Sequence, residues 1–342
     1  MRKTAVAALL LLAVTPAWAQ EPYHILRTVT VGGDGGFDYV TVDSKGRRLY
    51  VARSGKTNQR LLAFDLDSLK QTGELDGINA HGAVVDEASR HGFASSKPIA
   101  MFDPISLALL KSIAVEGNPD GMTSDPAEGR VYVLSHSTPN ITAINAADGT
   151  VLGALDIEAA PEETAADGKG HLYVALENKG AVGVVETRSL SVTARYPLAG
   201  TCGTPAGLAM DVKNQILFVA CRNPAVMVMV NALNGAILQA IPIGIGNDGV
   251  VFNPATGEAI ASQGEGTLVI IKQQGPGHFV LEQTLSTLPG AKTLALDAKS
   301  GHIFLITADY GPVPADAQPP SNGRIARGPM LADSFKILEI GR

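Results

Sequence analysis

Six of seven regularly spaced positions in this sequence carry polar side chains that could bind a ligand or a metal ion. The seven positions, each the second residue of a repeated segment, are Asp38, His81, Asp120, Glu162, Ala206, Asp248 and Lys292. Carboxylates and imidazoles are accepted as ligands by first-row divalent metals. Because these residues are spread over most of the chain, they can act together only if the fold brings the repeats around one point.

The repeated segment is predicted to be a β-hairpin. Residues 205–222, PAGLAMDVKNQILFVACR, contain two short apolar runs separated by a polar turn over residues 211–215. Such a pattern is typical of two antiparallel strands. Six further copies begin at Phe37, Ala80, Pro119, Pro161, Asn247 and Ala291. The chain is therefore built on a repeat.

The period of the repeat predicts the architecture. Successive copies are separated by 43, 39, 42, 44, 42 and 44 residues, and a third and a fourth apolar run follow each hairpin. A period of about 40–45 residues made only of strands is the signature of a β-propeller blade. We predict an all-β fold with one domain over residues 20–342, a seven-bladed β-propeller of four-stranded blades.

The two ends of the chain are predicted to complete one blade together. Residues 334–340 supply a third strand to the last blade, and no fourth strand follows. Residues 24–31 form an outer-type strand with no blade before it. We expect residues 24–31 to close the ring, because closure removes exposed sheet edges.

In a propeller, the residue that enters each inner strand lies at one mouth of the central channel. The loops after the second strands open on the same face and carry Arg53, His136, Glu177, Arg222, Glu265 and Asp309. Converging titratable groups make this mouth the predicted ligand-binding site, with Asp38, His81, Asp120, Glu162, Asp248, Lys292, Arg53, His136 and Arg222 as candidate residues. The alternative is a solvated polar rim, since strand entries are commonly polar.

The predicted mouth is asymmetric in charge. Lys292 stands between Asp248 and Asp38, whereas His81, Asp120 and Glu162 have no Lys or Arg at the equivalent positions. Two carboxylates in a confined site repel each other unless a positive group lies between them. These three residues are therefore the predicted site for a divalent metal ion or a cationic ligand group, unless Arg222 or Arg53 reaches in from a loop.

A long segment interrupts the last blade. Residues 311–333, GPVPADAQPPSNGRIARGPMLAD, are rich in Pro and Gly. A loop of this length without strands is commonly a functional lid or a mobile segment. On its predicted face it would cover the channel mouth, and disorder is the alternative interpretation.

The beginning of the chain is predicted to be a signal peptide over residues 1–19. Arg2 and Lys3 precede an apolar run over residues 5–14, and Ala17-Trp18-Ala19 forms a cleavage site. The apolar run is too short to span a bilayer, which takes about 20 residues. We expect a periplasmic or secreted monomer with no membrane insertion after cleavage.

The charge of the mature chain argues against nucleic acid as a partner. Cleavage would leave 25 basic and 33 acidic residues, a formal charge of −8. Nucleic-acid surfaces are basic, and platforms for single strands add aromatic side chains. We therefore expect a small molecule or a periplasmic protein as the partner.

The only two cysteines are Cys202 and Cys221, at the two ends of one predicted hairpin. An antiparallel hairpin brings its ends to the same side, and disulfides form in oxidising compartments. We predict a disulfide between them, with two buried free thiols as the alternative, since spacing alone does not fix pairing geometry.

Several catalytic and nucleotide-binding signatures are excluded. The run GIGNDG at residues 244–249 matches G-x-G-x-x-G, but no helix follows it. The chain has no C-x-x-C-H haem motif, no G-x-S-x-G elbow and no H-E-x-x-H zinc helix.

The repeat resembles the YncE-like family of exported YVTN-type propellers, which are related in shape to the quinoprotein amine dehydrogenase propellers and to WD40/YVTN repeats. The resemblance is carried by a core D-x-x-x-G/N-x-x-φ-φ-V-A (φ apolar), seen at residues 43–52, 125–134, 167–175 and 211–220. It covers the mature chain and implies the fold. It implies little about activity, because propellers host unrelated functions.

Two classes of function follow from these features. One is a non-catalytic binding or scaffold module that uses the channel mouth. The other is a metal-assisted lactonase-type hydrolase, in which the ion polarises an ester carbonyl and a carboxylate or histidine acts as base. The ligand set is partial, which favours binding. An accessory role in a redox system with a diffusible cofactor is a third interpretation.

Overall fold

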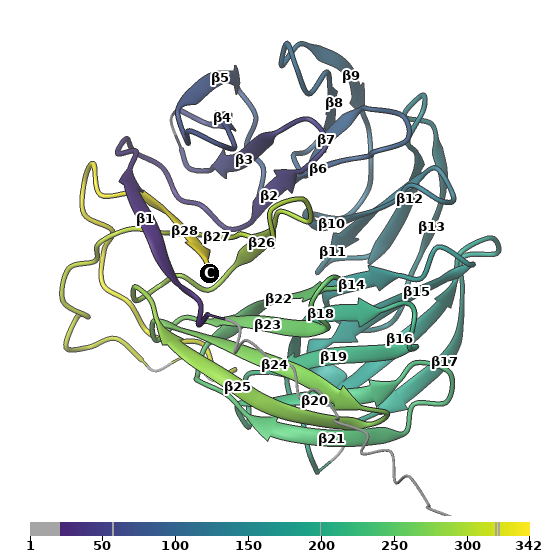
Figure 1. Cartoon of the computed structure of the whole chain (residues 1–342). Helices are drawn as coiled ribbons and strands as arrows, with labels where there is room; N and C mark the ends of the chain where they lie inside the picture. Colours follow the sequence, from purple (N-terminus) through teal and green to yellow (C-terminus); the bar gives the residue numbers. More distant parts are fainter. Residues whose placement is uncertain (1–20, 57, 199, 319, 321) are drawn as a thin grey trace, which may run out of the picture.

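The strands of this protein form seven four-stranded antiparallel sheets, as seen in a computed structural model that describes residues 21–342 except 57, 199, 319 and 321. The sheets follow one another around a common centre (Figure 1). This confirms the predicted seven-bladed propeller. The predicted signal peptide lies outside the described residues.

Each of the first six blades is a consecutive meander of strands. Blades 1 and 2 contain β2 (Val40–Asp43), β3 (Arg48–Arg53), β4 (Arg60–Asp65), β5 (Gln71–Asp76), β6 (Ala83–Val85), β7 (Gly92–Ala94), β8 (Ile99–Phe102) and β9 (Leu109–Ile113). Blades 3 and 4 contain β10 (Pro119–Asp125), β11 (Arg130–Ser135), β12 (Ile141–Asn145), β13 (Val151–Leu155), β14 (Pro161–Ala166), β15 (His171–Leu176), β16 (Ala181–Glu186) and β17 (Ser191–Pro197). Blades 5 and 6 contain β18 (Pro205–Asp211), β19 (Ile216–Cys221), β20 (Val226–Asn231), β21 (Ile237–Pro242), β22 (Asn247–Asn253), β23 (Glu258–Gln263), β24 (Thr267–Gly275) and β25 (His278–Ser286). One short 3₁₀ helix, η1 (Glu177–Lys179), follows β15.

Blade 7 is shared between the two ends of the described chain. Its strands are β26 (Leu294–Leu296), β27 (Ile303–Thr307), β28 (Lys336–Gly341) and β1 (His24–Thr30). Strand β1 pairs antiparallel with β28, and Thr30 lies opposite Lys336 (Figure 1). The predicted closure by the N-terminal strand is confirmed, and the pairing removes the free edge of β28.

The Asp of each repeat organises the turn of its hairpin. In blade 1, Asp43 Oδ1 accepts a hydrogen bond from the Gly46 backbone N–H at 2.8 Å. In the other six blades, the side chain at the equivalent position accepts a hydrogen bond from a backbone N–H of its turn. These residues are Asp86, Asp125, Asp167, Asp211, Asn253 and Asp297. Asp43 also accepts from Arg90 of the next blade, at 2.7 Å. The repeated Asp therefore shapes a tight turn, and in this pair it also ties two blades together.

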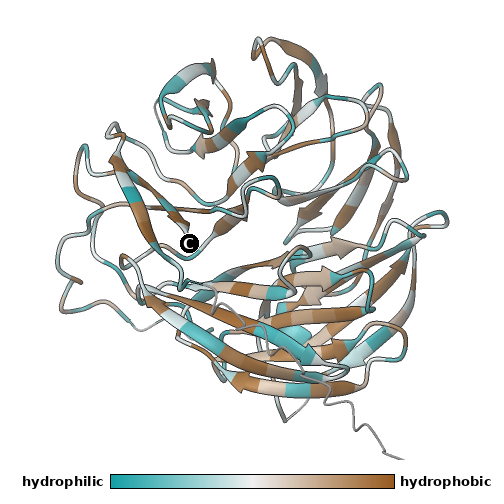
Figure 2. Ribbon diagram, viewed as in Figure 1, coloured by the Kyte–Doolittle hydropathy of each residue, from teal (hydrophilic) through white to brown (hydrophobic). Residues whose placement is uncertain are grey.

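The hydrophobic core is divided into layers between neighbouring blades. Each of seven buried apolar clusters of described residues joins two blades, such as Val219 and Val228 of blade 5 with Val182 of blade 4. Second strands such as β19 are buried along their whole length, whereas outer strands such as β1 alternate between exposed and half-buried residues. Figure 2 shows that the outer strand β25 carries both hydrophilic and hydrophobic residues along its length. Packing of blade against blade therefore fixes the distances around the channel.

Blade 5 carries the disulfide. Cys202 and Cys221 are bonded, with their Cα atoms 5.7 Å apart. Pro205 at the start of β18 lies opposite Cys221 at the end of β19, which brings the two cysteines to one side. The predicted pairing is confirmed, and the bond lies next to Arg222, a residue of the channel mouth.

Candidate functional site

The polar residues of the repeat lie at one mouth of the channel, as predicted. Asp120, Glu162 and Asp248 are the second residues of β10, β14 and β22. Asp38, His81 and Lys292 stand just before β2, β6 and β26. In blade 5 the equivalent residue is Ala206 in β18, and the charged residue of that blade, Arg222, directly follows β19.

Eight side chains at this mouth make a closed circuit of charged contacts, here called the charge ring. In order around the channel they are Lys292, Asp38, His81, Asp120, His136, Glu162, Arg222 and Asp248. Acidic and basic residues alternate strictly. Two of the four basic positions hold permanent cations, and the other two hold histidines, which are charged only when protonated.

The first part of the charge ring, the arginine–lysine arc, consists of Arg222, Asp248 and Lys292. Arg222 is fully buried and pairs with Asp248 and, at 2.5 Å, with Glu177. Lys292 bridges Asp248 and Asp38, the latter at 2.8 Å. Burial alone would raise the pKa of Asp248, but Lys292 and Arg222 hold it below its ordinary value. This arc confirms the predicted bridge by Lys292.

Arg222 also reaches Glu162, at 3.4 Å. The sequence left open whether an arginine from a loop reaches the carboxylates of this side. The structure shows that Arg222 does so at Glu162. Burial raises the pKa of Glu162 to about 7, and the nearby charge of Arg222 opposes that rise.

The second part, the histidine arc, consists of His81, Asp120 and His136. His81 Nδ1 lies 3.2 Å from Asp38 and 3.4 Å from Asp120 Oδ1, and His136 Nε2 lies 3.8 Å from Asp120 Oδ2. The His81 and His136 side chains are 51% and 41% exposed. The hydrogen bond with Asp38 raises the pKa of His81, and burial raises the pKa of Asp120. This arc is open to solvent, unlike the buried Arg222.

One atom of the histidine arc is left without a hydrogen bond. Asp120 Oδ1 is buried and has no hydrogen-bond partner among the described residues. Its nearest charged neighbour, His81 Nδ1, lies closer to Asp38 Oδ2. A buried carboxylate oxygen in this state favours a positive ligand.

The donor atoms that converge most closely belong to Asp38, His81 and Asp120. One atom from each lies within 4.8 Å of the others. This trio shares His81 and Asp120 with the predicted metal set and contains Asp38 in place of Glu162. Arg222 and Arg324 both contact the Glu162 carboxylate, which draws it into ion pairs.

Arg53, another predicted mouth residue, turns away from the charge ring. Its guanidinium lies 4.1 Å from the centroid of the Phe335 ring and donates to the backbone carbonyls of Gly32 and Gly35. These contacts hold the segment between β1 and β2. Asp309, on a loop of the same face, pairs with Lys336 and also stands outside the charge ring.

The long loop over residues 311–333 crosses the arginine–lysine side of the mouth. Asn322 donates to Glu177 and Arg324 donates to Glu162, both at 3.2 Å. Between them, Gly323 has φ 74°, and a Cβ there would lie 2.7 Å from the Arg222 carbonyl oxygen. A close approach at positive φ requires glycine. The loop thus packs over Arg222 and leaves a cleft of about 190 Å³ beside Lys292.

Sequence reasoning missed three residues of this region. Arg324 lies in the long loop and carries no repeat signal, while Tyr39 and Glu163 each follow a predicted mouth residue directly. Tyr39 and Glu163 point into the channel below the charge ring. The alternation of side chains along a strand could have identified both, because neighbours of mouth residues face different directions.

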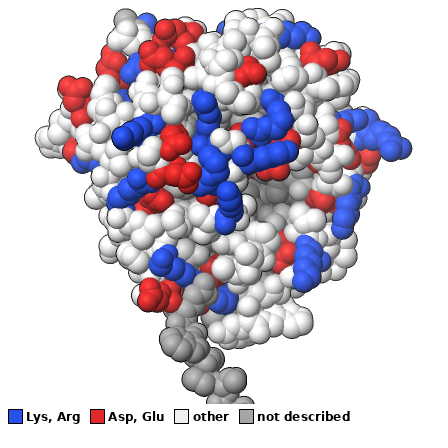
Figure 3. Space-filling view, turned by 45° about the horizontal axis from the view of Figure 1, so that its top comes forward, with Lys and Arg blue, Asp and Glu red and all other residues white. Residues whose placement is uncertain are grey.

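Charges of both signs are mixed on one face of the molecule (Figure 3). On the face that Figure 3 presents, Lys and Arg side chains lie among Asp and Glu side chains, around a hollow. In the part of the chain that the structure describes, no helix is long and apolar enough to cross a membrane.

Several solved structures, from unrelated assemblies, are similar in architecture to this chain. The chain is similar to a chain of the mitotic checkpoint complex, with a TM-score of 0.70, 12% identity and coverage of 87% of this chain and 95% of that one. It is also similar to the WD40 repeats of RRP9, with a TM-score of 0.67, 11% identity and coverage of 93% and 97%. Hydrazine synthase of Kuenenia stuttgartiensis is similar at a TM-score of 0.60, with 16% identity and coverage of 70% and 84%.

These similarities establish a seven-bladed β-propeller with WD40-repeat neighbours. At 11–16% identity they concern the fold alone. No family model and no curated protein matches the sequence. Propellers host unrelated functions, so function must be argued from the mouth itself.

Proposed function

We propose that this protein is a binding module that holds a positively charged group of a ligand or partner protein at the histidine arc. One observation carries the proposal. The charge ring alternates acid and base, yet two of its four basic positions are histidines, and they flank Asp120, whose Oδ1 makes no hydrogen bond to any residue that the structure describes. When the two histidines are neutral, a bound cation would supply the positive charge that the ring lacks next to Asp120.

The charge count supports this assignment. With His81 and His136 neutral, the charge ring has four carboxylates and two permanent cations, Lys292 and Arg222. Both of these cations lie at the opposite side, where they are already paired with Asp38, Asp248 and Glu162. The unbalanced negative charge is therefore concentrated at Asp120, in a confined site where electrostatic attraction is stronger than in bulk water.

The experiment is calorimetric titration of chelator-treated protein with Ca²⁺, Mn²⁺, Zn²⁺ and methylammonium. We expect heat from at least one of these cations with the parent protein and none with a His81→Ala, Asp120→Ala double variant. Asp309→Asn is the matched control, since Asp309 is an acidic residue of the same face outside the charge ring. Absence of heat with every probe, or equal heat from the parent and the double variant, would refute the proposal.

The second candidate is the metal-assisted lactonase-type hydrolase. It is favoured by the convergence of Asp38, His81 and Asp120 donor atoms within 4.8 Å. A divalent ion held there would polarise an ester carbonyl, and His136, which is not one of the trio and lies 3.8 Å from Asp120, would act as the base. Lactone hydrolysis that appears with added metal, disappears with chelator and is lost in His136→Gln would support it. Metal binding without hydrolysis would leave binding as the function.

We further propose that the chain is an exported, YncE-like propeller that acts as a monomer. The sequence of residues 1–19 and the disulfide support export, because disulfides persist in oxidising compartments. Mass spectrometry of the secreted or periplasmic protein should find Gln20 as the first residue. Duplex DNA should bind weakly at physiological salt, given the formal charge of −8 after cleavage.

A further inference from the structure

A cavity of about 420 Å³ fills the central channel below the charge ring. This volume lies within the range of small-molecule sites. The cavity begins at Tyr39, Glu162 and Glu163, next to the charge ring, and extends to Val42, Phe252 and Leu296. Tyr39 and Val42 are three residues apart on one inner segment, which corresponds to about 10 Å along an extended chain.

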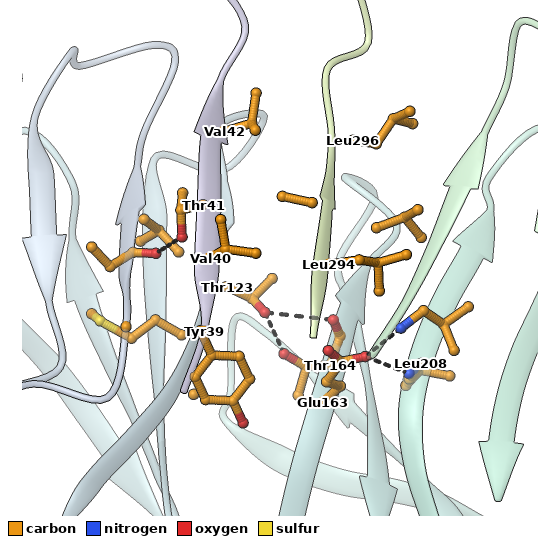
Figure 4. Close-up of a pocket in the computed structure, with 18 of the residues that line it drawn as sticks. Tyr39, Val40, Thr41, Val42, Thr123, Glu163, Thr164, Leu208, Leu294 and Leu296 are labelled. Atoms are coloured by element: carbon orange, nitrogen blue, oxygen red, sulfur yellow. Dashed lines mark hydrogen bonds between the residues drawn. The ribbon is translucent and has the colours of Figure 1, made fainter. Parts of the chain in front are cut away.

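Glu163 is the carboxylate in the wall of this cavity that makes no ion pair among the described residues. Its Oε2 accepts hydrogen bonds from the backbone N–H groups of Leu208, at 2.8 Å, and Val250, at 3.3 Å (Figure 4). These N–H groups belong to β18 and β22, the inner strands of blades 5 and 6. The carboxyl of blade 4 is thus held across the channel in a fixed orientation, with Oε1 free of partners among the described residues.

The chemistry of the remaining wall is mostly apolar. The Thr41 hydroxyl donates a hydrogen bond to the Ala83 carbonyl, and the Thr123 and Thr164 hydroxyls are hydrogen-bonded to each other (Figure 4). These three hydroxyls therefore already have partners within the wall of the cavity. The end away from the charge ring is formed by Val42, Val84, Phe252 and Leu296. Among the described lining residues there is no Lys, Arg or His.

We propose that this cavity binds a small primary amine with an apolar group. The ammonium group lies against Glu163 Oε1, and the apolar group lies between Phe252 and Leu296. An amine satisfies the features of the cavity together, because it supplies the missing counter-charge and donors at one end and apolar surface at the other. The site is separate from the histidine arc and does not depend on the function proposed for it.

The ionisation of Glu163 provides a distinctive readout. Burial raises its pKa to about 8, although the N–H groups of Leu208 and Val250 oppose the rise. In the empty site the Glu163 carboxyl is therefore mostly protonated at pH 7. It must lose this proton to pair with an ammonium group. Binding an amine as its ammonium ion should release close to one proton at pH 7, whereas at pH 9.5 Glu163 is already ionised and the partly neutral amine should take up protons instead.

The experiment is titration calorimetry with benzylamine and its neutral counterpart benzyl alcohol, in two pH 7 buffers of different ionisation enthalpy. We expect benzylamine to bind at least tenfold more tightly than benzyl alcohol, with release of close to one proton. Glu163→Gln keeps an acceptor for the two N–H groups but removes the charge, so it should abolish both the preference and the proton release. Leu296→Phe should weaken benzylamine and spare methylamine.

Each result decides the proposal. Equal binding of amine and alcohol, binding without proton release, or unchanged affinity in folded Glu163→Gln would overturn it, as would no binding of benzylamine to the parent protein. Retained benzylamine binding in His81→Ala, Asp120→Ala would place the amine in the channel rather than at the histidine arc. Loss of binding in that double variant, with a normal melting temperature, would assign the amine to the mouth instead.

Discussion

The two arcs of the charge ring have the same alternation of acid and base but differ in what supplies the positive charge. In the arginine–lysine arc, Arg222 is fully buried and Lys292 touches two carboxylates. In the histidine arc, His81 and His136 are about half exposed. Their distances to Asp120, 3.4 and 3.8 Å, are longer than the 2.8 Å between Lys292 and Asp38. The first arc is electrostatically complete at any pH where Arg and Lys are charged. The second is complete only when its histidines are protonated.

This difference separates structural from functional charge within one ring. Buried ion pairs hold their partners in place, and removal of one partner leaves an uncompensated charge. The half-exposed histidines pair with carboxylates that water also reaches, and such exposed pairs contribute little to stability. The arginine–lysine arc therefore fixes the geometry of the mouth, and the histidine arc is the part that can exchange a proton for a ligand.

Arg222→Met should produce the largest effect. It leaves Glu162, Glu177 and Asp248 without their shared cation, and we expect a loss of about 3–5 kcal/mol in the free energy of unfolding, measured by urea denaturation. Arg324→Met is the matched control. Arg324 also contacts Glu162, but its side chain is 47% exposed, so its removal should cost about 1 kcal/mol or less. Equal costs for the two variants would remove the distinction between buried and exposed cations.

Loss of the disulfide should come next. Cys202→Ala with Cys221→Ala opens a loop closed across 19 residues, and the chain-entropy model gives a cost of about 3 kcal/mol. Because Cys221 precedes Arg222, the same variant should loosen the arginine–lysine arc and leave His81 unaffected. Urea denaturation and NMR chemical shifts of the histidine rings test the two parts. A shift confined to His81 and His136 would contradict this assignment.

The histidines themselves should matter little for stability. His81→Gln with His136→Gln removes side chains that are about half exposed, and we expect a cost of about 1 kcal/mol or less. The same urea experiment on Arg222→Met provides the comparison. If the double variant were destabilised as strongly as Arg222→Met, the histidine arc would be a structural element too.

The smallest effect concerns the titration of His81. Its pKa is raised by Asp38 in the folded state, so its contribution to stability is full below pH 6.5 and is lost as the pH rises through the folded pKa. Asp38→Asn should lower the pKa of His81, because the hydrogen bond with Asp38 is the main cause of its rise, and NMR titration follows that change. Asp309→Asn should leave that pKa unchanged. An unaltered pKa in Asp38→Asn would mean that Asp120 alone holds the His81 proton.

The fold was accessible from the sequence because its information is local and repeated. The hairpin pattern recurs seven times, and the Asp of each copy, such as Asp43 or Asp211, forms its turn with neighbours two or three residues away. Closure of the ring could be predicted because residues 24–31 form a strand with no blade before it, and the last blade lacks its fourth strand. Even the disulfide depended only on the two ends of one hairpin.

The site was accessible only in part. The sequence indicated which residues stand at the mouth, since strand entries are fixed by the repeat, and it placed Lys292 between Asp248 and Asp38. It did not determine the direction of the long side chains that follow the second strands. Arg53 and Arg222 occupy equivalent places, yet Arg53 lies on Phe335 and Arg222 enters the charge ring.

What the sequence determined by itself was therefore the number of blades, the closure of the ring and the residues that enter the inner strands at the mouth. The tertiary structure alone decided which cation pairs with which carboxylate, that Arg324 of the long loop reaches Glu162, and that Glu163 faces a cavity. The physical reason is the range of the interactions. Turns and the strand pairs of each hairpin arise from residues close in sequence, whereas the ion pairs of the charge ring join side chains 16 to 254 residues apart, whose distances are set by the packing of all seven blades.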